Sequence, residues 1–249
     1  MFVMEKYLKN IKLSSDNLKL IACLIMLIDH ASFSLLHYYM MMYHMDIVPQ
    51  TYTKLNQLYE IGRGIGRIAF PIFCFFLVEG FFRTHNILKY IGRTLLFAII
   101  SELPFDLAHY KEAFYPDHQN VLFTLTLGLL MMLLLKHIKS GIAGLDVPTK
   151  VIASLCAVAG FAELASLLNV DYSYKGILLI AVLYFFREYK PFNLLAGAAA
   201  VSWEANGPVA FILLYFYDPD QKPKLKYFFY WFYPVHLALL YLIGLILFH

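Results

Sequence analysis

The sequence predicts an all-α fold, a polytopic transmembrane helical bundle, and three observations support this. Hydrophobic residues make up 61% of the 249-residue chain and charged residues only 15%, whereas soluble domains are roughly 45–50% apolar and about 25% charged. Mean hydropathy is +0.64. Apolar runs close to the ~20 residues needed to cross a bilayer recur along the chain. No linker or low-complexity segment divides it, so residues 1–249 are expected to form one membrane domain.

Seven apolar runs are clear candidates for spans: residues 18–43, 65–82, 94–108, 121–137, 150–168, 172–187 and 229–248. The first follows a basic stretch, as a secretory signal does, but it is too long and lacks a small-residue cleavage site, so we expect it to be retained. Residues 192–217 differ, because two short apolar pieces flank the polar segment 203–208. Each piece is nearer half a span in length, which predicts two short helices or one re-entrant hairpin. The bundle then has about nine spans, or seven and a hairpin.

The distribution of lysine and arginine predicts the orientation. Fifteen of these residues, beginning with Lys6, Lys9, Lys12 and Lys19, fall in alternate connections; the opposite set holds five, Lys54, Arg63, Arg67, Lys111 and Lys175. The positive-inside rule then places the N-terminus in the cytoplasm and the C-terminus outside. We expect a multi-pass membrane protein, in contact with membrane lipids and with no nucleic-acid partner.

Asp29 and His30 lie deep inside the first apolar run. A charged side chain near the bilayer centre costs roughly 2.5–3.5 kcal/mol on insertion scales, so such residues are rarely kept without a role. Histidine titrates near neutral pH and can take a proton from an attacking hydroxyl or amine. We therefore expect His30, with Asp29 beside it, to be catalytic. A proton relay for transport and a polar contact between helices are the alternatives.

Lys19 lies eleven residues before His30. Eleven helical steps of about 100° return to within roughly 20° of the start and rise about 16 Å, so the two side chains share one face. His37 and His44 follow at seven-residue intervals, which is too far for two histidines to bind one metal ion. The three cysteines also lack metal-ligand spacing, and no metal site is expected.

Arg63 and Arg67 lie one turn apart where the second run begins. They either reach the outer headgroups or bind an anionic group, or pair with Asp29 or Glu79 across helices. Glu79 itself lies near the far end of that run. These residues are candidates for the lining of a polar interior.

Glu102 and Asp106 share one face of the third run at four-residue spacing, and Pro104 between them should kink the helix. Two carboxylates on an apolar span need partners or water, so they either line a cavity or mark a helix end at the interface. The connection 83–93 carries Arg83 and Arg93. It contacts either lipid headgroups or a phosphate-bearing cytosolic cofactor.

Four sequence blocks occur in an order and spacing found in one known family. They are Leu18-Lys19-Leu20-Ile21-Ala22 with Met26-Leu27-Ile28-Asp29-His30; Ile65-Gly66-Arg67-Ile68-Ala69-Phe70-Pro71-Ile72-Phe73 through Val78-Glu79-Gly80-Phe81; Tyr90-Ile91-Gly92-Arg93-Thr94-Leu95-Leu96-Phe97-Ala98 with Pro104-Phe105-Asp106-Leu107-Ala108; and Asn120-Val121-Leu122-Phe123-Thr124-Leu125. On these blocks the chain resembles the TraX family, which is named for the F-pilin acetylase. In the C-terminal half, Tyr233-Pro234-Val235-His236 is similar to a segment of related enzymes.

The TraX family is itself similar to a wider group of transmembrane acyltransferases, in which a basic residue, ten intervening residues and a histidine mark the first helix. Lys19 and His30 fit that spacing. The resemblance implies a location in the bacterial cytoplasmic (inner) membrane and acetyl-CoA as the acyl donor, used from the cytoplasm. It also implies an acceptor on or within the membrane, a hydroxyl or amine of a cell-surface glycan, lipid or peptide.

The resulting hypothesis assigns a role to each candidate residue. Lys19, Arg83 and Arg93 would attract the phosphates of acetyl-CoA, and His30 would act as general base or as transient acyl carrier, with Asp29 biasing its charge state. The polar interior would be lined by Arg63, Arg67, Glu79, Glu102 and Asp106. A membrane transporter or permease with an intramembrane proton-relay histidine is the rival, since broken helices and intramembrane carboxylates are common in carriers. A structural assembly factor for surface polymers is a third class.

Overall fold

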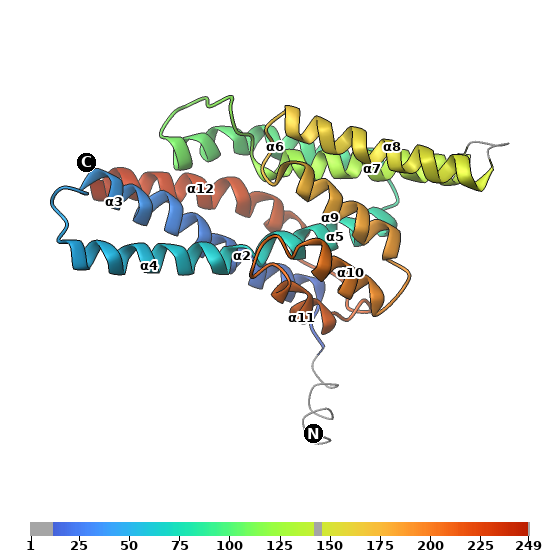
Figure 1. Cartoon of the computed structure of the whole chain (residues 1–249), viewed down its shortest axis with the longest axis horizontal. Coiled ribbons are helices and arrows are strands. Elements are labelled where there is room, and N and C mark those ends of the chain that lie inside the picture. Colours follow the sequence, from blue (N-terminus) through green and yellow to red (C-terminus); the bar gives the residue numbers. More distant parts are fainter. Residues whose placement is uncertain (1–11, 142–145, 249) are drawn as a thin grey trace, which may run out of the picture.

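The computed structural model describes residues 12–141 and 146–248, in which helices and their connections account for the chain apart from two isolated β-bridges. Figure 1 shows an elongated bundle whose helices run along its long axis. The predicted all-α class is confirmed for this part of the chain. Lys6 and Lys9, which contribute to the predicted orientation, lie outside the described residues.

The first predicted span is a continuous helical rod of three segments, α2 (Ser15–Ala31), the π-helix η1 (Ser32–His37) and α3 (Tyr38–Met42). The rod begins at a Ser14 N-cap, whose hydroxyl accepts a hydrogen bond from the Asn17 N–H at 3.1 Å. The π turn starts two residues after His30, where the Ser32 hydroxyl donates to the Ile28 carbonyl at 2.8 Å. Such turns occur mostly as single turns within α-helices, often at functional sites.

The second helical stretch begins earlier than the expected boundary at residue 65. It consists of α4 (Pro49–Gly66) and α5 (Ala69–Arg83), joined by a short turn. Polar residues fill the first half of α4, so its hydropathy conceals the helix, although Pro49 occupies the first-turn position that proline favours. α4 packs against α2 and α5 against both α2 and α9.

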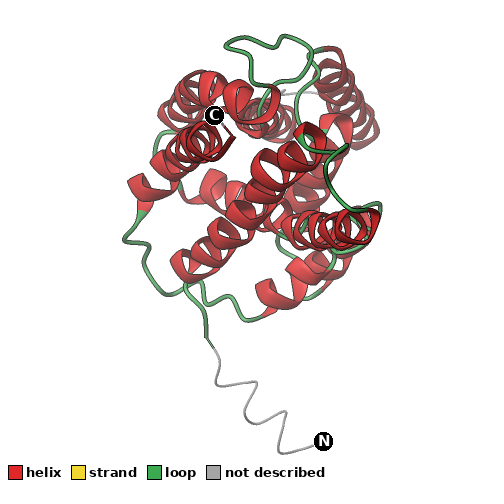
Figure 2. Ribbon diagram, turned by 90° about the vertical axis from the view of Figure 1, so that its left-hand side faces the viewer, coloured by secondary structure: helices red, strands yellow, loops and turns green. Residues whose placement is uncertain are grey.

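The remaining clear runs form α6 (Ile87–Tyr110), α7 (Val121–Gly141), α8 (Val147–Leu167), α9 (Ser173–Phe186) and α12 (Lys226–Phe248). α6 continues through Pro104. Figure 2, turned by 90°, shows the helices grouped around a common centre. α12 packs along α6 and also contacts α2, while α7, α8 and α9 pack on one another.

The ambiguous stretch 192–217 forms two short helices, α10 (Phe192–Ala200) and α11 (Val209–Tyr215), which pack together. After α11 the chain returns to the beginning of α2, where the Leu13 N–H donates to the Phe216 carbonyl and the Asp218 N–H to the Leu13 carbonyl, each at 2.9 Å. The Asp16 carboxylate fixes the start of α12 by accepting from the backbone N–H of Lys224 and Leu225. The two short helices therefore enter and leave near one end of the bundle.

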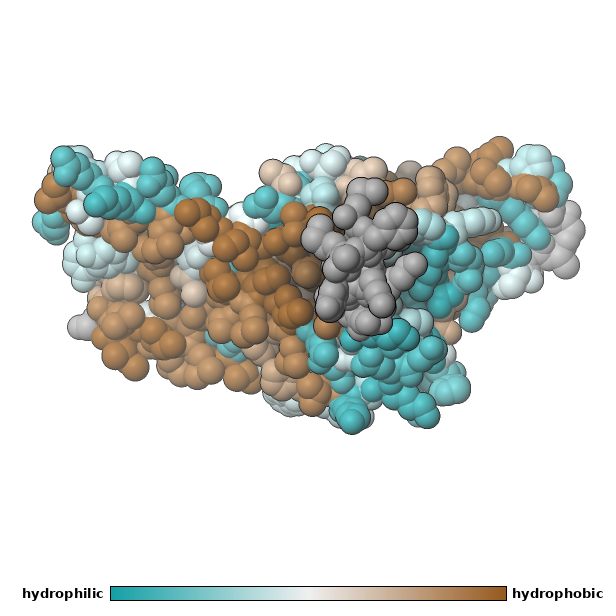
Figure 3. Space-filling view, turned by 90° about the horizontal axis from the view of Figure 1, so that it is seen from below, coloured by the Kyte–Doolittle hydropathy of each residue, from teal (hydrophilic) through white to brown (hydrophobic). Residues whose placement is uncertain are grey.

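The outer surface is largely apolar. Five helical stretches of the described residues are long and apolar enough to cross a membrane. Figure 3 shows hydrophobic side chains over a broad area of one face, with hydrophilic ones gathered toward its margins. Large apolar side chains stand exposed on most helices, among them Leu24, Leu96, Leu155 and Leu239. Contact of these apolar side chains with lipid costs no free energy, whereas their exposure to water is unfavourable. The chain is therefore a multi-pass membrane protein.

Candidate functional site

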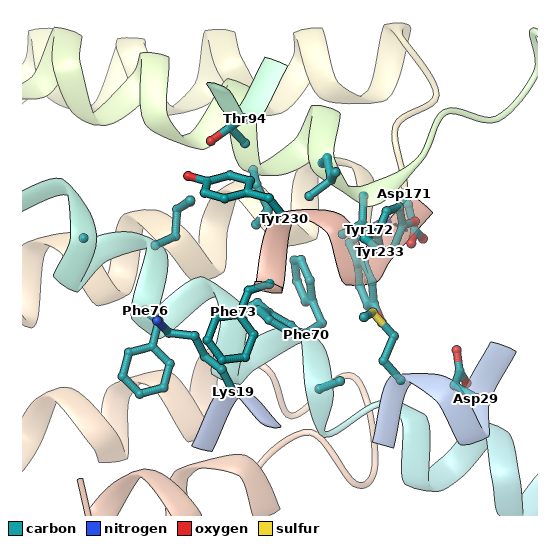
Figure 4. A pocket seen from close by; sticks show the side chains of 18 of the residues that line it. Lys19, Asp29, Phe70, Phe73, Phe76, Thr94, Asp171, Tyr172, Tyr230 and Tyr233 are labelled. Atoms are coloured by element: carbon teal, nitrogen blue, oxygen red, sulfur yellow. Dashed lines mark hydrogen bonds between the residues drawn. The ribbon is translucent and has the colours of Figure 1, made fainter. Parts of the chain in front are cut away.

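A cavity of about 500 Å³ runs through the bundle between α2, α4, α5, α6 and α12. Its two ends differ in chemistry. One end, called here the basic end, is lined by Lys19, Arg83, Arg93 and Lys226; the other, the histidine end, is lined by His30, His109, His118 and Asp171. Figure 4 shows Lys19 and Asp29 on opposite sides of the cavity, with Phe70, Phe73 and Tyr233 between them.

The basic end holds positive charge that the described residues leave uncompensated. The Lys19 ammonium lies 5.2 Å from the ring centroid of Phe76 and 5.0 Å from that of Phe229, and it forms no ion pair in this part of the chain. Arg93 has a buried Nε without a hydrogen-bond partner among these residues. A buried charged donor without a partner is costly. An anion bound here would supply the missing interaction.

Arg83 and Glu79 belong to an ion network at the same end. The Glu79 carboxylate accepts from Arg83 Nη2 at 3.1 Å and from Arg187 Nε at 2.8 Å. Arg83 also donates to the Pro219 carbonyl at 3.1 Å, which ties the link before α12 to α5. Arg187 also pairs with Glu188, so the two guanidinium groups of this network are balanced by two carboxylates. The uncompensated charge of this end therefore comes from Lys19 and Arg93 rather than from Arg83.

Three histidines from three helices meet at the histidine end. Nδ1 of His30 (α2) lies 2.7 Å from Nε2 of His236 (α12), and Nδ1 of His236 lies 2.7 Å from the Phe232 carbonyl oxygen. The ring of His109 (α6) is 5.2 Å from that of His30, edge to face, and its Nδ1 contacts the Phe105 carbonyl at 3.0 Å. His30 and His109 line the cavity, while His236 is buried behind His30.

Asp29 pairs with α4 rather than with its neighbour His30. Its Oδ2 accepts from Arg63 Nη1 at 2.7 Å, and both side chains are largely buried. One turn further, Arg67 lies 3.5 Å from Glu204 in the turn between α10 and α11. Of the three alternatives for Arg63, pairing across helices to Asp29 is the one that the structure shows. The cavity is lined by Asp29, Arg63 and Arg67, as expected for a polar interior.

Glu102 and Asp106 lie outside the cavity lining, which corrects the expectation that they line the polar interior. Glu102 accepts from the backbone and side-chain amides of Asn120, and Asp106 accepts from the Tyr115 N–H at 2.9 Å. The shared face of these two carboxylates is turned toward the connection between α6 and α7. They fix this connection, because its backbone donors need acceptors where no regular helix supplies them.

A second cavity, of about 350 Å³, adjoins the histidine end. It shares four lining residues with the first, namely Arg67, His118, Asp171 and Tyr172. His118, in the connection after α6, lies 3.7 Å from Asp171. The interaction with that carboxylate is the main cause that raises the pKa of His118 above its usual value. The two cavities therefore adjoin at these four side chains.

Several residues of the site were not among the expected ones. Lys226 belongs to a cluster of lysines, residues 222–226, whose pattern indicates orientation but no site. His109 is a single polar residue at a helix end, with no pattern to mark it. His236 was visible in the segment Tyr233-Pro234-Val235-His236, but its partner on α2 lies 206 residues away. The Tyr233 hydroxyl, also in this segment, is buried without a hydrogen-bond partner in the described part of the chain.

None of the groups of His, Cys, Asp and Glu side chains in residues 12–141 and 146–248 is arranged to hold a metal ion. Nδ1 of His109 and Nδ1 of His236 each face a backbone carbonyl, and Nδ1 of His30 faces another imidazole. In each of the three rings, one nitrogen is therefore engaged in a hydrogen bond.

Comparison with known proteins identifies relatives over almost the whole chain. A family profile described as "TraX protein" matches residues 14–244. The chain is 30% identical over 261 aligned residues to a probable fimbrial assembly protein, FimC of serogroup H1, from Dichelobacter nodosus, with 93% of this chain and 96% of the relative covered. No solved structure matches significantly.

Proposed function

The chain belongs to the TraX family, and we propose that it is an integral-membrane acyltransferase that moves an acetyl group from acetyl-CoA to a hydroxyl or amine. The observation that carries the proposal is the cavity, which joins a cationic end to a histidine end. Lys19 and His30 are separated by about 16 Å along α2. A ligand that occupies both ends must therefore be long, with anionic groups at one end and its reacting atoms at the other. Acetyl-CoA has that distribution of charge.

The basic end would bind the phosphates of the donor. Among the described residues, Lys19 has no ion pair and Arg93 has a buried Nε without a hydrogen-bond partner, and Lys226 adds a third cation from α12. Arg83 would contribute at the edge, because Glu79 and the Pro219 carbonyl already occupy part of its guanidinium. The apolar side chains between the ends, such as Phe73 and Phe76, would exclude water from the thioester arm.

His30 would carry the proton transfer. In direct transfer, its Nε2 removes the proton of the acceptor hydroxyl or amine as that group attacks the thioester carbonyl carbon. The carbon–sulfur bond then breaks, and the proton passes from Nε2 to the departing thiolate, which leaves as CoA thiol. Alternatively, Nε2 attacks the thioester carbonyl carbon first, the carbon–sulfur bond breaks, and CoA leaves as the thiolate while the acetyl group stays on Nε2. The acceptor then attacks this acetyl group, the carbon–nitrogen bond breaks, and the acceptor's proton goes to the CoA thiolate. In both routes the buried Tyr233 hydroxyl, which belongs to a cavity-lining residue, would donate to the carbonyl oxygen as negative charge develops on it.

The acceptor would approach through the second cavity. That cavity adjoins His118 and Asp171 at the histidine end, opposite the proposed entry of the donor. The acceptor would be a group of a cell-surface glycan, lipid or peptide, and a peptide of a fimbrial subunit agrees with the name of the Dichelobacter nodosus relative, a probable fimbrial assembly protein. We place the protein in the bacterial cytoplasmic membrane, with the basic end toward the cytoplasm because acetyl-CoA is made there.

The direct test is consumption of acetyl-CoA by the purified protein in lipid nanodiscs. The protein is incubated with acetyl-CoA labelled in the acetyl group and an extract of the cell envelope, and CoA thiol release and acceptor labelling are measured. We expect His30→Ala to abolish both signals. The matched control is His37→Ala, on the same helical rod but outside the cavity lining, and this variant should retain activity.

The alternatives give different results in this assay. A transporter or an assembly factor would release no thiol in any variant, and full activity of His30→Ala would contradict the assigned role of His30. Incubation without acceptor separates the two routes, since label that stays on wild-type protein but not on His30→Ala indicates an acetyl-histidine intermediate.

A further inference from the structure

The hydrogen bonds behind His30 specify which of its nitrogens carries a proton. A backbone carbonyl oxygen can only accept, so Nδ1 of His236, 2.7 Å from the Phe232 oxygen, must donate. A neutral His236 then has an unprotonated Nε2, which can only accept. Nδ1 of His30 lies 2.7 Å from this atom and must therefore donate to it. His30 is left with an unprotonated Nε2, for which no hydrogen-bond partner occurs among the described residues.

The position of the two rings agrees with this order. His30 lines the cavity and His236 does not, and the rings lie nearly parallel, 5.0 Å apart between centroids. His236 is only 4% exposed, held between the backbone of α12 and the His30 ring. His236 therefore cannot meet a substrate in the cavity, but it can set the state of the residue that does.

We propose that His236 is a positioning residue, which holds His30 as the Nδ1–H tautomer and thereby presents Nε2 of His30 to the cavity as the basic, nucleophilic nitrogen. The inference rests on the proposed function for its catalytic consequence, although not for the tautomer itself. The role is analogous to that of the carboxylate or carbonyl that usually orients a functional histidine. Here the Phe232 carbonyl orients the His236 ring, and the His236 ring in turn orients His30. When His30 becomes protonated during transfer, its Nδ1–H remains hydrogen-bonded to His236, so the charge is stabilised without loss of the ring orientation.

Two substitutions at the same position separate positioning from packing. In His236→Gln the amide oxygen can reach the region of Nε2 and accept from His30, whereas in His236→Leu a side chain of comparable bulk has no acceptor. We expect kcat to fall about 10–100-fold in His236→Leu, with the KM for acetyl-CoA unchanged, and to recover largely in His236→Gln. Equal kcat values for His236→Leu and wild type would overturn the proposal, as would equal losses in both variants.

A measurement without turnover keeps this inference distinct from the acyltransferase assignment. Solid-state NMR of protein with ¹⁵N-labelled histidine, in lipid, distinguishes a protonated Nδ1 from a protonated Nε2, and the His30 signals are assigned by their absence in His30→Ala. We expect Nδ1–H at His30 in wild type and in His236→Gln, and a shift toward Nε2–H in His236→Leu. An Nε2–H tautomer in wild type refutes the inference even if the enzyme is active. Conversely, the expected tautomers without any acetyl-CoA consumption would leave His236 as the orienting residue and remove the acyltransferase function.

Discussion

At the scale of single residues, Lys19 provides the sharpest test of donor binding. Its ammonium lies between two aromatic rings and faces the cavity without a carboxylate in ion-pair contact among the described residues. A hydrogen bond to a charged group contributes about 1.5–3 kcal/mol, so Lys19→Ala should raise the KM for acetyl-CoA at least about tenfold with little change in kcat.

The control for this substitution is Lys136→Ala. Lys136 is exposed near the end of α7 and does not line the cavity, so the same loss of charge should leave both constants unchanged. A similar increase in KM for both variants would show that only the overall charge of this surface attracts the donor, and a normal KM in Lys19→Ala would remove Lys19 from the binding site.

At the residue scale, the shared face of Lys19 and His30 could be predicted because both residues belong to one helix. Lys19 and His30 both line one cavity, as helical periodicity predicts for residues eleven positions apart. Periodicity could not identify His109 and His236, because the contact depends on how three separate helices pack. For the same reason the two carboxylates at Glu102 and Asp106 were assigned to the interior: spacing shows that they share a face but not which neighbour that face meets.

At the scale of elements, two glycines on α4 determine how closely it approaches α2. A Cβ added at Gly62 would overlap the Ser32 side chain, and one added at Gly66 would overlap the Asp29 side chain. This small-residue spacing allows two membrane helices to pack in backbone contact. The close contact is what brings Arg63, between the two glycines, within 2.7 Å of Asp29.

The substitution Gly66→Ala should therefore destabilise the protein and misplace Asp29. Overpacking of a close contact costs about 1–3 kcal/mol, which would lower the midpoint of thermal unfolding in detergent and also reduce kcat. Gly92→Ala is the matched control, because a Cβ there meets nothing within 4 Å, and a helical Gly→Ala change at an open position is favourable by about 1 kcal/mol. If Gly66→Ala were as stable as wild type, the contact between α2 and α4 would be looser than described.

At the scale of the whole molecule, the apolar runs predict most of the helices but not their limits. Hydropathy marks a helix only where its residues are apolar, so it does not detect the polar half of α4. The second helical stretch therefore begins at Pro49, not at the expected residue 65. The segment 192–217 left two readings open, and its two short helices follow from the polar interruption between them. The arrangement of the helices around a cavity was beyond sequence reasoning, because lateral packing in a bundle leaves no periodic signal that specifies the neighbour.

The last prediction concerns the orientation of the bundle, on which the use of cytoplasmic acetyl-CoA depends. Excess lysine and arginine mark the cytoplasmic side, so Lys139 should face the cytoplasm and Phe114 the opposite side. Both positions are exposed. In a Cys156→Ala background, which leaves only the buried Cys23 and Cys74, a membrane-impermeant maleimide should label Phe114→Cys in intact spheroplasts. Lys139→Cys should react only after permeabilisation. The reverse pattern would place the basic end outside the cell, where acetyl-CoA does not reach it, and would remove the donor from the proposal whatever the chemistry at His30.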